Sequence, residues 1–166
     1  MRKFFPLLLI ALALPGCALQ PLYGGGTTGA VSQQLGQIEI SAIEGRAGWL
    51  MRNALDDRLE MIGGGDVRYR LDVRLDDEID GFGVISNDQI TRERRTLRAR
   101  YQLVDIASGA VVLDATAGSD AGIDVVSSEY ATIAAEDRAL ENLAQVVADQ
   151  IVARLSLFAR QQASAP

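Results

Sequence analysis

Cys17 is the only cysteine of the chain, and its sequence setting suits a thiol that accepts a lipid. A basic start at residues 1–3 is followed by an apolar run of about ten residues and a small residue, Gly16, which is the layout of a secretory signal. The ending Leu14-Pro15-Gly16-Cys17 is typical of a lipobox, in which the cysteine receives a diacylglyceryl group. The run is also shorter than the roughly 20 residues that a membrane span needs. We therefore predict that residues 1–16 are removed and that Cys17 carries a covalent lipid anchor.

Arginines between positions 68 and 100 form a second group with a defined chemistry. Guanidinium groups stay charged at any relevant pH and bind phosphate through paired hydrogen bonds. Because side chains alternate across a strand, most of these arginines fall on one face of two predicted strands. If those strands are neighbours, the sequence predicts a guanidinium patch formed by Arg68, Arg70, Arg74, Arg92, Arg94, Arg98 and Arg100, with Arg95 in the same region.

The same arginines have a purely structural alternative. They can form cross-strand ion pairs with acidic neighbours such as Asp72, Asp76 and Glu93. Exposed pairs of this kind contribute only about 0–1 kcal/mol each. The residue pattern leaves both interpretations open, and it does not identify the ligand of a binding patch.

Composition excludes several classes of protein. The chain lacks histidine, so a histidine-based catalytic triad is impossible, and it has neither a Gly-x-Ser-x-Gly elbow nor a phosphate-binding glycine loop. Without residues 1–16 it has 14 basic and 22 acidic residues, a formal charge of −8, which disfavours nucleic-acid binding. The acids at positions 76–80 lack the spacing of a calcium loop and are expected to be solvated. We expect neither an enzyme nor a metal or cofactor site.

Hydrophobic periodicity predicts the elements that must position these residues. A short strand is expected over 38–42, and a helix runs from about Gly48 to Ile62 and ends at Gly63-Gly64-Gly65. Residues 67–76 alternate strictly and predict a strand, which a loop over 77–87 follows. The remaining predicted elements are a strand over 90–105, a turn at Ser108-Gly109, a strand over 111–117 and a long helix over 130–161.

This order, β-α-β-β-β-α, predicts an α+β fold. The simplest packing is a two-layer sandwich, with a mainly antiparallel four-stranded sheet and two helices on one face. The domain is expected to span residues 37–162. Residues 17–36 are predicted to be a flexible tether and residues 163–166 a disordered tail.

The segment Cys17-Ala18-Leu19-Gln20-Pro21-Leu22-Tyr23-Gly24 resembles the Cys-Gly-Phe-x-Pro-Leu-Tyr start of the lipopolysaccharide-assembly lipoprotein family LptE. The order of elements and the long alanine-rich helix from Tyr130 also resemble that family. Ala18-Leu19 replaces its Gly-Phe. By resemblance to enteric bacterial lipoproteins, the absence of aspartate at Ala18 favours the outer membrane.

The resemblance implies a lipoprotein on the periplasmic side of the outer membrane that plugs the LptD β-barrel, helps it assemble and touches lipopolysaccharide. Two further periplasm-facing lipoprotein functions stay open. One is an auxiliary subunit of a lipid-transport ABC system, and the other is an activator of a peptidoglycan synthase. The sequence does not separate these functions, because they share an anchor, a tether and a small domain.

Overall fold

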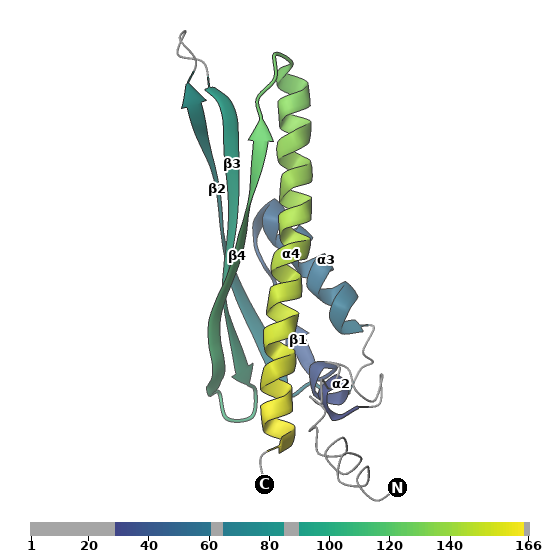
Figure 1. Cartoon of the computed structure of the whole chain (residues 1–166). Helices are drawn as coiled ribbons and strands as arrows, with labels where there is room; N and C mark the ends of the chain where they lie inside the picture. The colour runs from purple at the N-terminus through teal and green to yellow at the C-terminus, as the bar shows by residue number, and fades with distance from the viewer. Residues whose placement is uncertain (1–28, 61–64, 85–89, 165–166) are drawn as a thin grey trace, which may run out of the picture.

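A computed structural model describes residues 29–60, 65–84 and 90–164. It contains a four-stranded sheet of order β1-β2-β3-β4, in which β1 is parallel to β2 and the other neighbours are antiparallel (Figure 1). The α+β fold and the predicted order of strands and long helices are confirmed. The elements are α2 (Ala30–Leu35), β1 (Ile38–Ile40), α3 (Gly45–Glu60), β2 (Tyr69–Val84), β3 (Ile90–Asp105), β4 (Val111–Asp124) and α4 (Glu129–Ser164).

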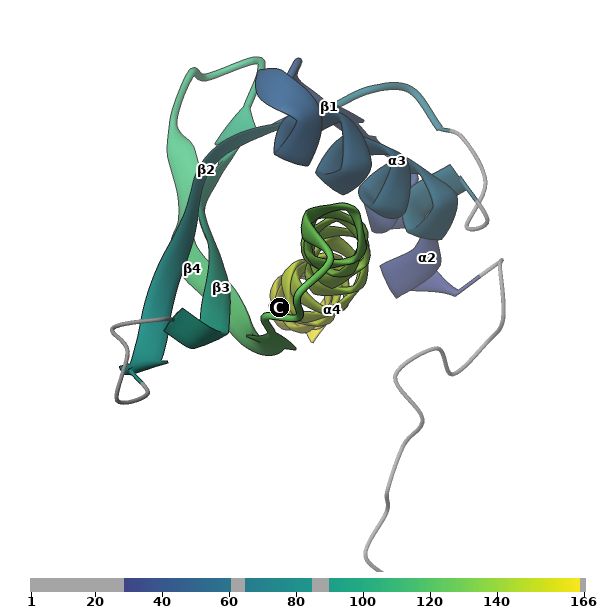
Figure 2. The same cartoon turned by 90° about the horizontal axis from the view of Figure 1, so that it is seen from above.

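Helix α4 is the centre of the packing. The sheet curves around one side of it, and α3 and α2 lie on the other side (Figure 2). Both long helices therefore occupy the same side of the sheet, as predicted, although α3 packs mainly on α4 and β1. The apolar residues that recur at helical spacing along α4, from Ile133 to Phe158, are largely buried, but Ile133 is 48% exposed. The fully buried positions of α4 include Leu140, Val147, Ile151 and Leu155.

The strands β2 and β4 are longer than their local patterns predict. Residues 77–84, expected to be a loop, continue β2 and pair with β3, which has its predicted bounds. β4 likewise extends from the predicted end at Ala117 to Asp124, opposite Arg92. These extensions are rich in glycine and acidic residues, so they lack the apolar alternation of a strand. Pairing with β3 supplies the hydrogen bonds and opposite charges that hold them extended.

The ends of the domain also differ from prediction. Helix α2 folds within the predicted tether, and its buried Leu35 joins the core beside α4. Helix α4 continues to Ser164, two residues into the predicted tail. The turn at Ser108-Gly109 is present, with Gly109 at φ 69°. The rest of the tether, Gly63-Gly64 and residues 165–166 lie outside the described residues.

The outer half of the β2–β3 pair, residues 76–84 and 90–98, is here called the distal hairpin. It is held to α4 by Arg95, whose side chain points to the helix side of the sheet. The Arg95 guanidinium donates to both carboxylate oxygens of Asp77 at 2.8 and 2.6 Å and to the carbonyl of Glu136 at 2.9 Å. The pair is mostly buried, with side-chain exposures of 11% and 22%.

The Glu136 carboxyl group lies next to that of Glu93 at the same contact. Burial raises the pKa of Glu136, and the Glu93 and Asp137 charges raise it further, against the opposing effect of Arg95. A carboxyl group with a raised pKa in the folded state favours folding most at low pH, where it is protonated. That contribution is lost as the pH rises through the folded-state pKa.

Replacing Arg95 by Met is expected to destabilise the domain by roughly 2 kcal/mol, between the values typical of exposed and buried ion pairs. A double-mutant cycle with Asp77→Asn measures the coupling by thermal or urea unfolding. The matched control is the ion pair between Arg92 of the distal hairpin and Asp124 of β4, whose side chains are 61% and 78% exposed. Its coupling should not exceed about 1 kcal/mol. Equal coupling in both cycles would contradict the docking role of Arg95.

Glu136→Gln is expected to raise the melting temperature at neutral pH, because it removes a charge beside Glu93. The gain should vanish in acid, below the ordinary pKa range of glutamate, because the raised pKa of Glu136 leaves its carboxyl group already protonated there. Glu141→Gln, on an exposed position of the same helix, is the control for loss of one negative charge. A stabilisation that is equal at both pH values would show that charge repulsion is not its cause.

Candidate functional site

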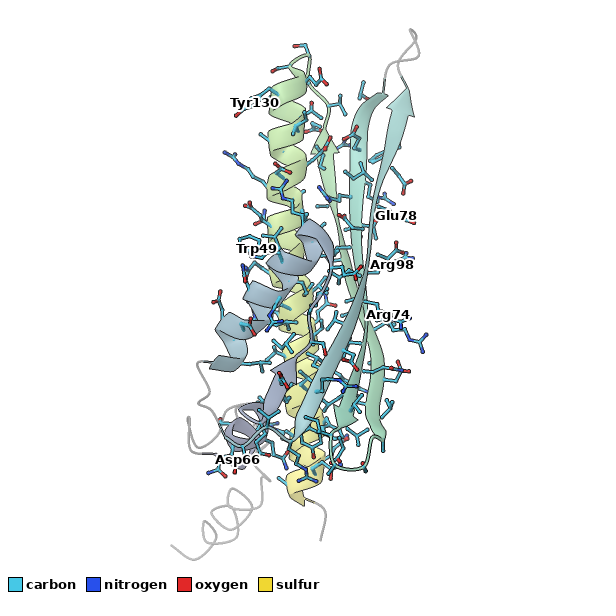
Figure 3. All side chains as sticks on the ribbon, turned by 180° about the vertical axis from the view of Figure 1, so that it is seen from behind. Trp49, Asp66, Arg74, Glu78, Arg98 and Tyr130 are labelled. Atoms are coloured by element: carbon cyan, nitrogen blue, oxygen red, sulfur yellow. The ribbon has the colours of Figure 1, made fainter. Side chains whose placement is uncertain are left out.

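The predicted arginines of β2 and β3 lie on one face of the sheet. The register pairs Arg74 with Arg100 and Asp76 with Arg98, so even-numbered residues of both strands share this face. It is the face turned away from the helices, as Figure 3 shows for Arg74, Arg98 and Glu78. We call it the outer face.

Acidic side chains share the outer face with the arginines. Among the described residues, six arginines of β2 and β3 stand with eight acids, so the face as a whole is close to neutral. The acids of the outer face are Glu39 of β1, Asp72, Asp76, Glu78 and Asp80 of β2 and Asp114, Asp120 and Asp124 of β4. Four of the arginines form ion pairs, which join Arg70 to Asp72 (3.0 Å), Arg92 to Asp124 (3.1 Å), Arg94 to Asp120 (3.8 Å) and Arg100 to Asp114 (3.0 Å).

In two of these ion pairs, the arginine lowers the pKa of its acidic partner. A hydrogen bond from the Arg70 guanidinium lowers the pKa of Asp72, to which Ser41 also donates. Hydrogen bonds from Arg100 and Gln102 lower the pKa of Asp114 in the same way. Asp72 thus forms an ion pair, but with Arg70 of its own strand and not across strands as the alternative predicted. In the described part of the chain, Asp76 and Glu93 take part in no ion pair, and β4 supplies most of the partners.

Arg74, Arg98 and Arg100 form the densest group of positive charge, here called the central arginine cluster. Arg74 and Arg100 are direct cross-strand neighbours, and Arg98 lies two residues along the same face. Like charges in such positions destabilise a sheet unless another group neutralises them. Only Arg100 has an acidic partner within 4 Å among the described residues. Arg74 and Arg98 therefore retain free donors for an anion.

The surface around this cluster is open and polar. A shallow depression of about 700 Å³ is lined by the three arginines together with Thr96, Thr116 and Gly118. A Cβ atom on Gly118 would lie 3.2 Å from the Cγ atom of Arg98, so the glycine leaves room for that side chain. The Gln150 amide fixes the Gly118 backbone by accepting from its N–H at 3.2 Å and donating to its carbonyl at 3.3 Å. Several guanidinium and hydroxyl donors can thus reach one phosphate.

The other predicted arginines lie away from the cluster. Arg68 precedes β2, lies 3.5 Å from Asp105 and stacks on the Tyr69 ring at 5.0 Å. Arg94 stacks on Phe82 at 5.4 Å near the tip of the distal hairpin. Arg92 and Arg100 are about 27 Å apart along β3, given 3.3–3.4 Å per residue. The six arginines of β2 and β3 therefore share a face without forming a single binding site, and Arg68 lies before the start of β2.

Other predicted features have a simpler outcome. Cys17 lies outside the described residues, so its lipidation stays a prediction. Within the described ranges, no three acidic, cysteine or histidine side chains are placed to hold a metal ion. No helix in those ranges is long and apolar enough to cross a membrane. Sequence reasoning missed the contact between Arg95 and α4. The signal was present, because Arg95 has an odd number on β3 and therefore lies on the opposite face of the sheet from the outer-face arginines.

Comparison with known proteins supports one family. The family model for LptE, described as lipopolysaccharide-assembly, matches residues 35–155. A search of curated proteins finds no match.

Several solved structures have the same fold. A putative lipoprotein from Caulobacter crescentus is 27% identical, with a TM-score of 0.64, and the alignment covers 81% of this chain and 98% of that one. The rare lipoprotein B from Shewanella oneidensis is 10% identical, with a TM-score of 0.59 and coverages of 76% and 98%. An uncharacterized lipoprotein B from Nitrosomonas europaea is 14% identical, with a TM-score of 0.60 and coverages of 78% and 88%. Because the family model spans most of the chain, from α2 into α4, this protein belongs to the lipopolysaccharide-assembly family LptE.

Proposed function

We propose that this protein is an outer-membrane lipoprotein that assembles lipopolysaccharide into the outer leaflet together with an LptD β-barrel. The family match over residues 35–155 carries this proposal. The protein acts as a plug and assembly subunit and catalyses no reaction. The lipoprotein neighbours in other bacteria and the lipobox at Cys17 agree with this function.

The anchor at Cys17 holds the domain at the periplasmic face of the outer membrane. Only 12 residues separate Cys17 from Ala30, where α2 begins, so the domain stays close to the lipid surface. Tethering raises the effective concentration of the domain near a membrane-embedded partner without adding a contact. Recognition of the barrel and of the glycolipid belongs to the folded domain.

The outer face suits the polar, water-filled interior of a large barrel, because it exposes charge of both signs along two long strands. Within that face, the central arginine cluster binds the phosphates or the sugar carboxylates of lipopolysaccharide. Arg74 and Arg98 are the main donors, since Asp114 already occupies part of Arg100.

Affinity purification of the native complex tests the barrel partnership. A large outer-membrane β-barrel should co-purify with the full chain. A Cys17→Ser variant should leave the membrane fraction and still bind its barrel when overexpressed, because the domain carries the recognition. Co-purification of a peptidoglycan synthase or of an ABC permease in place of a barrel would overturn the proposal in favour of one of the two other lipoprotein functions.

The double variant Arg74→Gln/Arg98→Gln is expected to weaken binding of purified lipopolysaccharide by about tenfold or more, because it removes two charge-assisted donors. The matched control, Arg92→Gln/Arg94→Gln, changes the net charge equally but removes arginines that are already paired. Binding is measured by titration, and melting curves verify that the fold is retained. Equal losses in both variants would show that the ligand responds to net charge and not to the cluster.

A further inference from the structure

β2 has an open edge. Strand β1 ends at Ile40, which pairs with Leu71, and the Ser41 N–H donates to the Leu71 carbonyl at 3.1 Å. The chain then turns away into α3, while β2 continues to Val84. Among the described residues, no strand lies beside residues 72–84 on that side of the sheet (Figure 1).

The backbone of this edge is available for hydrogen bonding. The Leu71 carbonyl points toward β1, and backbone direction alternates along a strand, so the odd residues from Val73 onward direct their N–H and C=O groups outward. Residues 76–83 are all exposed as whole residues, although the Asp77 side chain is largely covered by its pairing with Arg95. Unpaired edge groups are a template for another strand, and proteins blunt them unless they are used.

The charge of the edge selects the partner. Asp76, Glu78 and Asp80 project from the outer face and form no ion pair with any described residue. In an antiparallel pairing of two copies about Glu78, Asp76 of one copy would stand opposite Asp80 of the other, and like charges in that position repel. The residues from Cys17 to Thr28 contain no basic residue and cannot complement the edge. A basic segment from a different protein fits the charge.

The helix side of the edge adds an apolar requirement. Leu75 is half-buried and Ile79 is 41% exposed, and both have the odd parity that faces the helices. A strand beside residues 75–80 would thus meet acids on one face and, on the other, these two apolar side chains with Asp77 between them, whose charge Arg95 neutralises. Because side chains alternate across a strand, the matching segment alternates basic and apolar residues.

We propose that the edge of β2 from Leu75 to Gly81 binds an extended segment of a partner protein by strand addition, and that this segment alternates basic with apolar residues. This interaction goes beyond the proposed function. It requires neither lipopolysaccharide nor the closed wall of a barrel, whose strands have no free edge.

A titration of the full chain in detergent with a short synthetic peptide that alternates lysine and valine tests the proposal. The lysine–valine peptide is expected to bind, and its affinity should fall as salt is added. A peptide that alternates glutamate and valine should not bind. The triple variant Asp76→Asn/Glu78→Gln/Asp80→Asn is expected to weaken binding about tenfold. The matched triple variant Asp114→Asn/Asp120→Asn/Asp124→Asn on β4 removes the same number of charges and should bind like the native chain. Equal binding of both peptides, or no binding of either, would overturn the proposal.

The backbone is tested separately. Ile79→Pro removes an outward amide donor and is expected to weaken peptide binding about tenfold, whereas Ile79→Ala keeps the donor and should weaken it less. Melting curves verify that both variants fold, and if the proline variant does not fold, the charge variants decide the result. Sedimentation should show no dimer held through this edge. A dimer lost in Ile79→Pro would mean that the edge pairs with a second copy.

Discussion

The burial of α4 on two sides is the constraint on which the rest of the domain depends. Leu140, Val147, Ile151 and Leu155 are almost inaccessible, although they belong to a helix of 36 residues that a flat sheet could cover on one side only. Each such aliphatic side chain contributes about 1.5–3 kcal/mol when buried. The curvature of the sheet and the positions of α3 and α2 follow from this requirement. Part of the segment expected to be a tether forms helix α2, and its Leu35 packs into the core beside α4.

Because α4 covers one side of the sheet, the charged side chains of the long strands lie mainly on the outer face. Its arginines and acids nearly cancel overall, which makes long polar strands soluble without a large field. The cancellation is uneven. Among the described residues, two guanidinium groups of the central arginine cluster and three carboxylates of the β2 edge have no partner of opposite charge within 4 Å. These two places, and not the total charge, are where we propose that the face binds its partners.

The distal hairpin joins both places to the core. Its β2 residues are exposed on either face, and its apolar burial comes mainly from Leu97 at the inner end of its β3 half. Beyond Leu97, Arg95 supplies the contact with α4 by binding Asp77 and the Glu136 carbonyl. The neighbouring Glu93 and Glu136 charges oppose this contact. Leu97 thus positions the hairpin by packing at its inner end, and Arg95 positions the rest by electrostatics.

The sequence by itself determined the α+β class, the bounds of β3, most of α4 and the shared face of the β2 and β3 arginines. Each of these depends on side-chain periodicity, which backbone geometry imposes locally. Only the tertiary structure decided that residues 77–84 and 118–124 are strands and that β4 acids neutralise Arg92, Arg94 and Arg100. It also decided that Arg74 and Arg98 have no acidic partner in the part of the chain that the structure describes. Those outcomes depend on register, and register is set by contacts between strands that are distant in the chain, which no local pattern contains.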